Sequence, residues 1–423
     1  MRPEQLRRQA CIGHSMAWAL AHLFSFELRD TARMNKAVKT VITVALLVAF
    51  GGAAYFSIFK TARLENGSAS ASPGTGPLAG LAGKLTGTVP VEELSGVIAL
   101  DVEPYFQDLR VQKRLADLGY RLKVTRIGSR DMAARVVKDQ TPEFLYASGV
   151  VAGNQIVDAA KKAGVSATMV SPIYTPMVIA SWTPIAKILA ANGMAAQRPD
   201  GVWTVDMAKL TQAMLDKKRW KDLQGAQAYD VNKSVLVSTT DVRKSNSAAM
   251  YLALTAFAVN GNEMVTDRDA ALKAAGAVLG LFKRQGYQEN YVNGNFDDYA
   301  SIGIGKTPMA FIYENQMVNY ALTKRGLGDS MVLLVPQPTL FNKVVFVATT
   351  DRAKKLGELL STDTELQHLA VAFGFRIADS AYFSQAAKGV GLTVDEHITQ
   401  VIDPPSFELM THMIDSISQG MAQ

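Results

Sequence analysis

The sequence predicts an α/β fold of two or three domains or lobes behind an N-terminal transmembrane helix. Three observations lead to this prediction. The chain has 423 residues and is 48% hydrophobic, which is enough for more than one large core. Short apolar runs alternate with helical patterns of about ten residues, as in βαβ units that build a parallel sheet. An uncharged run of twenty residues precedes the folded part.

The formal net charge of +6 is concentrated at the N-terminus. Residues 1–39 contain seven Lys or Arg and three acidic residues, so the remaining 384 residues have a net charge of only +2. A nucleic-acid-binding protein would need a basic face on its folded part, and no such run occurs. The single cysteine, Cys11, cannot form an intramolecular disulfide, and the five histidines are scattered. We therefore expect no metal site.

Residues 40–59, TVITVALLVAFGGAAYFSIF, are predicted to form a membrane-spanning helix. At 1.5 Å per residue the run is about 30 Å long, which matches the hydrocarbon core of a bilayer. The stronger basic flank precedes it, so residues 1–39 should be a short cytoplasmic segment of a single-pass inner-membrane protein. The folded domain should then lie on the periplasmic or extracellular side. The alternative is a cleaved signal peptide that starts at Met34, which the long apolar run and the poor processing site disfavour.

A linker is predicted between the membrane and the folded part. Residues 60–94 include a stretch rich in Gly, Ser, Ala, Thr and Pro, which is typical of a flexible tether. No cysteine follows the apolar run, so a lipid-anchored lipoprotein is not expected.

Hydrophobic period and turn residues predict the elements of the first part of the folded chain. In chain order we expect strands at residues 97–100, 120–127, 143–150 and 167–170, and helices at residues 111–118, 133–137 and 156–163. Loops after the carboxyl ends of parallel strands are where such sheets bind ligands. Ser129 and Ser148 lie at two of these ends.

The same patterns predict the later elements. We expect strands at residues 175–181, 331–335 and 344–348, a strand and turn at 309–316, and helices at 183–192, 203–220, 270–285 and 352–373. The predicted strands and helices end at residues 374–377. No internal repeat is present.

Residues 235–257, VLVSTTDVRKSNSAAMYLALTAF, contain the main candidate site. A short apolar β-like run passes into a polar turn, and Ser245 or Asn246 then begins a helix. A helix start presents unpaired N–H groups and the positive end of a dipole. Together with nearby hydroxyls and Arg243, this start is suited to hold an anion or a strongly polar solute. The alternative is an ordinary capped helix with a solvated Arg243.

Several short motifs occur in a specific order along residues 95–380. They are G-S-R at 128–130, S-G at 148–149, an apolar strand at 174–182, T-T-D-x-R-x-S-N-S at 239–247, Y-E-N-Q at 313–316, L-V-P-Q-P at 334–338 and Q-x-L-A-x-x-F-G-F-R at 367–376. In this order they resemble an extracytoplasmic, or periplasmic, solute-binding protein of the type II periplasmic-binding-protein fold.

The resemblance implies two α/β lobes that are joined by crossing strands and close on a solute. Lobe 1 would comprise residues 95–172 and 340–423, and lobe 2 residues 173–339. The resemblance also implies that an oxyanion would be held at helix starts by Ser, Thr and Arg. The predicted anchor departs from typical members, which are released or lipidated, and this puts free diffusion in doubt.

The candidate ligand-binding residues lie at predicted helix starts and strand ends. For the two early serines, the alternative is a simple N-cap or strand-end position. A buried carboxylate next to an anion would be unfavourable, so Glu314 indicates a cationic or polar ligand, or a salt bridge at the hinge. The candidates are Ser129, Ser148, Thr239, Thr240, Arg243, Ser245, Asn246, Ser247, Tyr313, Glu314 and Gln316.

No catalytic residue, metal or cofactor is predicted. Residues 303–307, GIGKT, resemble the end of a P-loop, but Ala300 replaces the required first glycine and Pro308 follows the threonine. Asp297 and Asp298 have no third metal ligand nearby in the sequence, so we interpret them as part of a solvated loop.

The predicted function is that of a membrane-anchored receptor. It would capture a small polar or anionic solute by lobe closure and serve an ABC permease or a membrane sensor. The alternative is a ligand-free structural or interaction protein of the cell envelope that retains the same fold.

Overall fold

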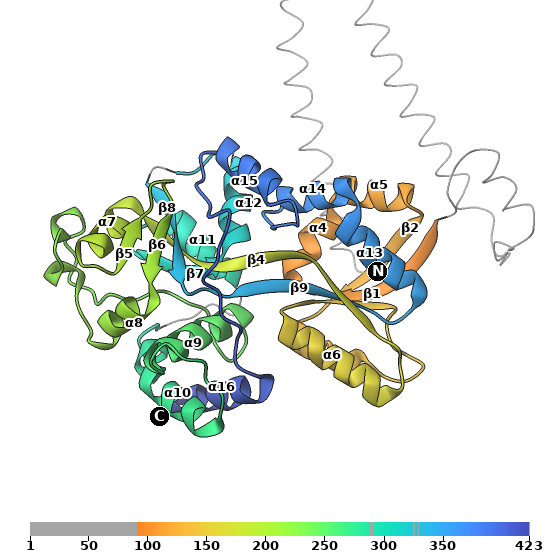
Figure 1. Cartoon of the computed structure of the whole chain (residues 1–423), viewed down its shortest axis with the longest axis horizontal. Coiled ribbons are helices and arrows are strands. Elements are labelled where there is room, and N and C mark those ends of the chain that lie inside the picture. Colours follow the sequence, from red (N-terminus) through yellow and green to blue (C-terminus); the bar gives the residue numbers. More distant parts are fainter. Residues whose placement is uncertain (1–90, 287–291, 325, 329, 423) are drawn as a thin grey trace, which may run out of the picture. The chain divides into compact units, whose positions relative to one another are not determined.

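The computed structural model describes residues 91–286, 292–324, 326–328 and 330–422 (Figure 1). The predicted transmembrane helix and almost all of the predicted linker lie outside these residues. Within the described ranges, no helix is both long enough and apolar enough to cross a membrane.

Two β-sheets that share one long strand organise the described residues. The strand order is β2-β1-β3-β9-β4 in the first sheet and β7-β4-β8-β6-β5 in the second. Figure 1 shows β4 beside β9 where the chain passes from one sheet to the other. The strands are β1 (Glu92–Ile98), β2 (Tyr120–Arg126), β3 (Phe144–Ser148), β4 (Thr168–Trp182), β5 (Ala195–Gln197), β6 (Trp203–Asp206), β7 (Met309–Tyr313), β8 (Met331–Gln337) and β9 (Phe341–Ala348).

The sheets are mixed, whereas the sequence predicted a parallel sheet. β1 is parallel to β2 and β3, and β6 is parallel to β8, but β9 runs antiparallel to both β3 and β4. The reason is that β9 returns from the second sheet, against the direction in which β4 left the first. β4 is one strand with a register shift between Val170 and Ile173, where two separate strands were predicted.

Helices cover both faces of each sheet. The α-helices are α4 (Glu103–Gln107), α5 (Leu109–Asp117), α6 (Val150–Ala163), α7 (Thr183–Ala191), α8 (Met207–Leu215), α9 (Asn246–Val259), α10 (Arg268–Lys283), α11 (Val292–Ile302), α12 (Glu314–Lys324), α13 (Asp351–Thr362), α14 (Thr364–Ala372), α15 (Ser380–Gly389) and α16 (Phe407–Ala422). The 3₁₀ turns are η2 (Leu100–Val102), η3 (Ser129–Asp131), η4 (Ala133–Arg135), η5 (Trp220–Asp222) and η6 (Ala226–Ala228).

Three apolar clusters account for this layering. One lies between α6 and the first sheet, and a second lies between the second sheet and α7 to α10. The third runs along the opposite face of both sheets, under α4, α5 and α11 to α15. Two helix-covered sheets joined by crossing strands are the arrangement that the resemblance to type II periplasmic binding proteins predicted, and this two-lobed α/β part of the fold prediction is confirmed.

The end of the chain forms a further crossing that the sequence did not predict. Ordered structure continues past residue 377, and residues 390–406 lead from α15 to α16. On the way, Thr339 N–H donates to the Gln400 carbonyl at 3.0 Å. α16 then packs on α10 and α9, with Met413 fully buried in their core. The prediction had placed residues 340–423 with the first lobe. The apolar face of α16 that contains Met413 instead packs on helices that cover the second sheet.

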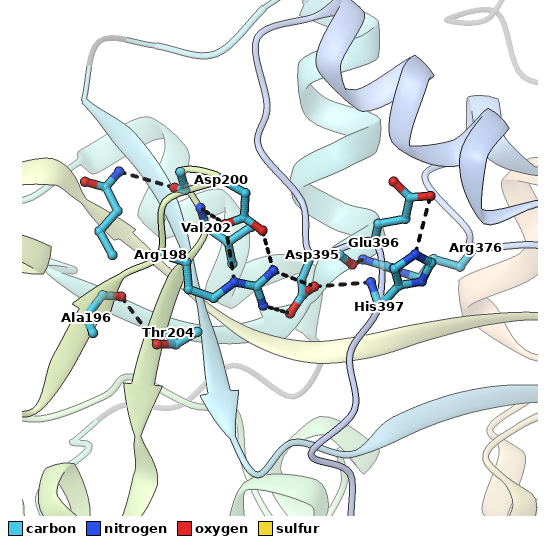
Figure 2. A network of polar contacts seen from close by, with 11 residues as sticks. Ala196, Arg198, Asp200, Val202, Thr204, Arg376, Asp395, Glu396 and His397 are labelled. Atoms are coloured by element: carbon cyan, nitrogen blue, oxygen red, sulfur yellow. Dashed lines mark hydrogen bonds and ion pairs between the residues drawn. The ribbon is translucent and has the colours of Figure 1, made fainter.

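Polar contacts anchor this last crossing on both sides (Figure 2). The buried Asp395 carboxylate accepts from Arg198, which follows β5, at 2.8 Å and from the His397 N–H at 3.2 Å. The Asp395 carbonyl accepts from Arg376 at 2.6 Å. The segment before α16 is therefore tied both to the second sheet and to the residues beside β4.

Other element predictions were wrong where a polar residue ends or begins a helix. The predicted helix at residues 203–220 is β6 followed by α8, because the Asp206 carboxylate caps α8 by accepting from Lys209 N–H at 3.0 Å. The predicted helix at residues 352–373 is broken at Asp363, which caps α14. Residues 133–137 contain only a 3₁₀ turn, and α12 begins directly after β7.

Candidate functional site

The described residues enclose a cavity of about 1100 Å³ that is partly open to solvent. Its walls are the starts of α6 and α9, the loops that follow β1 and β2, and α16. The lining residues are Leu100, Asp101, Gly128, Ser129, Arg130, Asp131, Ser148, Val151, Ala152, Gln155, Arg243, Lys244, Ser245, Asn246, Ala249, Met250, Gly294, Tyr313, Pro404, Phe407, Met410, Thr411, Ile414, Asp415 and Ser418.

Asp241 holds the turn that leads into α9. Its carboxylate accepts from the Arg243 backbone N–H at 2.9 Å and pairs with the Arg243 guanidinium at 2.6 Å, while its carbonyl accepts from Ser245 N–H at 2.9 Å. The hydrogen bond from the Arg243 side chain lowers the pKa of Asp241. The charge of Arg243 is thus already paired, although half of its side chain is exposed where it lines the cavity.

The start of α9 has no side-chain cap. Ser245 occupies the N-cap position, but its hydroxyl lies 3.0 Å from that of Ser247 instead of accepting from a first-turn amide. The Ser247 hydroxyl is buried and also lies 2.9 Å from the Thr240 hydroxyl. The amides at this end of α9 therefore keep their capacity to bind a ligand.

α6 begins at the same cavity, also without a side-chain cap. Its N-cap is Gly149, whose φ of +97° favours glycine. Ser148, at the end of β3, donates to the Asp101 carboxylate and accepts from Asn342 Nδ2 at 2.8 Å. The Ser148 N–H donates to the Ser129 hydroxyl at 2.9 Å. These bonds fix the strand end against the neighbouring loops.

The two halves approach each other across the cavity, where Gly149 lies near Asn246 and Arg130 contacts the Arg243 backbone. Asn246 Nδ2 donates to the Tyr313 hydroxyl at 3.1 Å, and it would lie 3.7 Å from a Cβ placed on Gly149. Arg130 Nη1 donates to the Arg243 carbonyl at 3.4 Å. Burial, with a smaller contribution from the nearby Asp101 charge, raises the pKa of Tyr313. Burial lowers the pKa of Arg130.

The Asp101 carboxylate, which lines the cavity, is expected to make the stability of the protein depend on pH. Burial raises its pKa above the ordinary value of 3.8, against the opposing effect of the hydrogen bond from Ser148. Because the pKa of this carboxyl is higher in the folded protein than in the unfolded chain, the unfolded chain ionises more readily. The free energy of unfolding therefore falls as pH rises above the ordinary pKa of 3.8. Asp101→Asn lacks this carboxyl and avoids the loss. The free energy of unfolding of the variant minus that of the unmodified protein is therefore expected to increase from pH 4 to pH 7. Urea unfolding at both pH values measures this, and an unchanged difference would contradict it.

Six of the eleven predicted residues line the cavity and five do not. Thr239, Thr240 and Ser247 are buried, and the last two contact each other beside the start of α9. Glu314 is paired with Arg376, as the hinge alternative predicted, and the Gln316 carbonyl Oε1 accepts from the Tyr313 N–H. The residues that line the cavity are Ser129, Ser148, Arg243, Ser245, Asn246 and Tyr313.

Sequence reasoning missed Asp101, Arg130 and the whole contribution of α16. Asp101 follows a predicted strand, so the strand-end argument applied to Ser148 could have found it. Nothing in the local pattern of residues 407–418 indicates a cavity wall, because that role depends on where the chain end packs. Among the described residues, no cluster of three or more His, Cys, Asp or Glu could hold a metal ion.

No family model and no curated protein matches this chain. Solved structures do resemble it. A sulfate-binding protein from Mycobacterium tuberculosis is 16% identical, with a TM-score of 0.44, and the match covers 70% of this chain and 90% of that one. A cyclic alpha-maltosyl-1,6-maltose binding protein from Arthrobacter globiformis is 11% identical, with a TM-score of 0.46 and coverage of 78% and 94%. An ABC transporter from Clostridium perfringens is 11% identical, with a TM-score of 0.48 and coverage of 78% and 99%. At these values the likeness does not identify what this chain binds.

Proposed function

We propose that this protein is an extracytoplasmic receptor that captures a small anionic or strongly polar solute in the cavity between its two sheets. Residues 40–59 would tether it to the membrane, and an ABC permease or a membrane sensor would receive the solute. The proposed lobes are those predicted from the sequence, with α16 attached to the second.

One observation carries the proposal. α6 and α9, which belong to different sheets, both begin at the cavity, and neither has a side-chain cap. Each start offers unpaired amides and the positive end of a helix dipole, so a negative group between them would be stabilised from two directions. Hydroxyl and amide side chains at the same place, such as Ser148 and Asn246, add hydrogen-bonding groups.

Closure of the lobes would couple binding to a change of shape. Because the two helix starts belong to different sheets, a solute could contact both only when the halves are together. Contacts such as Asn246 to Tyr313 and Arg130 to the Arg243 carbonyl lie beside the solute position and would form its surroundings.

The rival function is that of a ligand-free envelope protein. The pairing of Arg243 with Asp241 and the presence of Asp101 in the cavity favour it, because both reduce the positive charge available to an anion. Binding experiments separate the two functions directly.

Asn246→Asp is expected to weaken anion binding at least about tenfold while leaving the protein as stable or slightly more stable. A negative charge in the first turn of α9 repels an anion there but improves the interaction with the helix dipole, by about 0.3–1 kcal/mol. Calorimetric titration of the full chain with sulfate, phosphate, hexanoate and hexylphosphonate, combined with urea unfolding, measures both effects.

Asn260→Asp provides the matched control at the other end of the same helix. Asn260 is the C-cap of α9 and does not line the cavity, so this change should lower stability and leave binding unaltered. Equal affinity of Asn246→Asp and the unmodified protein for every anion that binds would exclude the α9 start as the site. Absence of binding by all four anions would favour the ligand-free protein.

A further inference from the structure

α16 packs one face into the core and turns another to the cavity, and Met410 and Ile414 contact both. Met413 and Ile417 are fully buried among the residues of α9 and α10, and Gly420 lies so close to Leu279 that a Cβ would come within 2.5 Å of it. Phe407 and Ile414, on another face, line the cavity, and Phe407 is 49% exposed. The core contacts therefore fix α16 in place, and its second face remains available to a ligand.

An apolar surface continues from α16 to the two helix starts. Met250, one turn into α9, and Val151, in the first turn of α6, line the same cavity as Phe407, Met410 and Ile414. Apolar side chains thus lie immediately beyond the uncapped amides. A ligand with its charged group at the helix starts would place the rest of its atoms against this surface.

The size of the cavity favours a ligand with such an apolar part. Its volume of about 1100 Å³ slightly exceeds that of most small-molecule pockets, which measure about 300–1,000 Å³. An inorganic oxyanion with five heavy atoms would leave most of this space, including the surface of α16, exposed to water. A molecule that covers Phe407 and Ile414 gains the free energy of removing apolar surface from water.

We propose that the solute is an organic anion with an apolar body, whose charged group lies at the starts of α6 and α9 and whose body lies against Phe407, Met410 and Ile414. This inference rests on the proposed function and adds the class of solute. It also makes α16, at the end of the chain, the element that determines specificity.

Two homologous series test the proposal by calorimetric titration of the full chain. They are methyl-, butyl- and hexylphosphonate, and acetate, butyrate and hexanoate. Each CH₂ group that leaves water is expected to strengthen binding about fourfold, so butylphosphonate, with three more CH₂ groups, should bind about 60-fold more tightly than methylphosphonate. The double variant Phe407→Ala, Ile414→Ala should reduce this dependence on chain length and leave the affinity for the shortest member of each series unchanged.

The control variant is Leu109→Ala, which removes an exposed leucine of α5 that does not line the cavity. It should keep the full dependence on chain length. If short and long members of a series bind equally well, the organic-anion proposal is wrong while the receptor function stands. If no member of either series binds and phosphate and sulfate also fail to bind, the receptor function itself fails. Loss of affinity for the shortest member in the double variant would show that α16 acts on the charged group instead.

Discussion

Arg376→Met is expected to lower the free energy of unfolding by about 3–5 kcal/mol, since it would leave the buried Glu314 carboxylate without a counter-charge. Arg376 donates to Glu314 at 2.5 and 2.9 Å and to the Asp395 carbonyl at 2.6 Å. The Arg376 and Glu314 side chains are 3% and 0% exposed, and the guanidinium lies 4.7 Å from the centre of the Phe383 ring. Burial, the largest single effect, would lower the pKa of Arg376, but the charge and hydrogen bonds of Glu314, together with the nearby Tyr174 and Asp395, raise the pKa overall.

Urea unfolding followed by circular dichroism measures the loss. The double variant Glu314→Leu, Arg376→Met should recover most of it, because removal of both charges leaves neither one unpaired. Lys113→Met is the surface control, since its pair with Asp117 is exposed to solvent and should contribute little to stability. A double variant as unstable as Arg376→Met alone would show that packing, and not the ion pair, stabilises this region.

Gly374→Ala is expected to cost about 2–5 kcal/mol, with two causes. Gly374 has φ of +80°, which costs an L-residue about 1–2 kcal/mol. A Cβ at this position would lie 2.2 Å from the Asn315 carbonyl oxygen, a backbone atom that cannot rotate away, and overpacking of this kind costs about 1–3 kcal/mol. The same unfolding experiment measures the total.

Gly164→Ala separates the two causes. Gly164 has φ of +70°, at the C-cap of α6, but a Cβ there would meet no atom within 4 Å. This variant should show the backbone cost alone, so the difference between the two variants reports the contact with Asn315. Equal losses would mean that α12 shifts to accommodate the methyl group without cost.

Arg376→Met and Gly374→Ala both act on the region that joins the crossing strand β4 to the cavity. The backbone of Arg376 exchanges hydrogen bonds of 3.1 and 2.8 Å with Tyr174 of β4, and its side chain holds Glu314 at the start of α12. Tyr313, the preceding residue, lines the cavity and accepts from Asn246. Arg376 therefore connects the crossing strand to the candidate site through two residues, and its loss should also weaken binding of any anion that the unmodified protein binds.

Elements with a clear local signal were predicted well. The strand at residues 144–148 has a buried side chain at every position, and the α9 start follows a run of capping residues. The predictions failed where a polar cap interrupts a helical pattern, as at Asp206 and Asp363, because the periodicity of apolar residues continues across the interruption. For Glu314 the sequence left a ligand contact and a salt bridge at the hinge as alternatives, and the structure pairs it with Arg376, 62 residues away.

By itself, the sequence determined the alternation of strands and helices, an apolar strand at residues 175–181, and a polar helix start at Asn246. These features depend on residues within one or two turns of each other, so their spacing is readable from the chain. The tertiary structure alone decided that α6 and α9 begin at the same cavity, that Arg376 neutralises Glu314 and that α16 forms a cavity wall. Each of these joins residues far apart in the chain, and their distances are set by how the sheets and helices pack and not by sequence spacing.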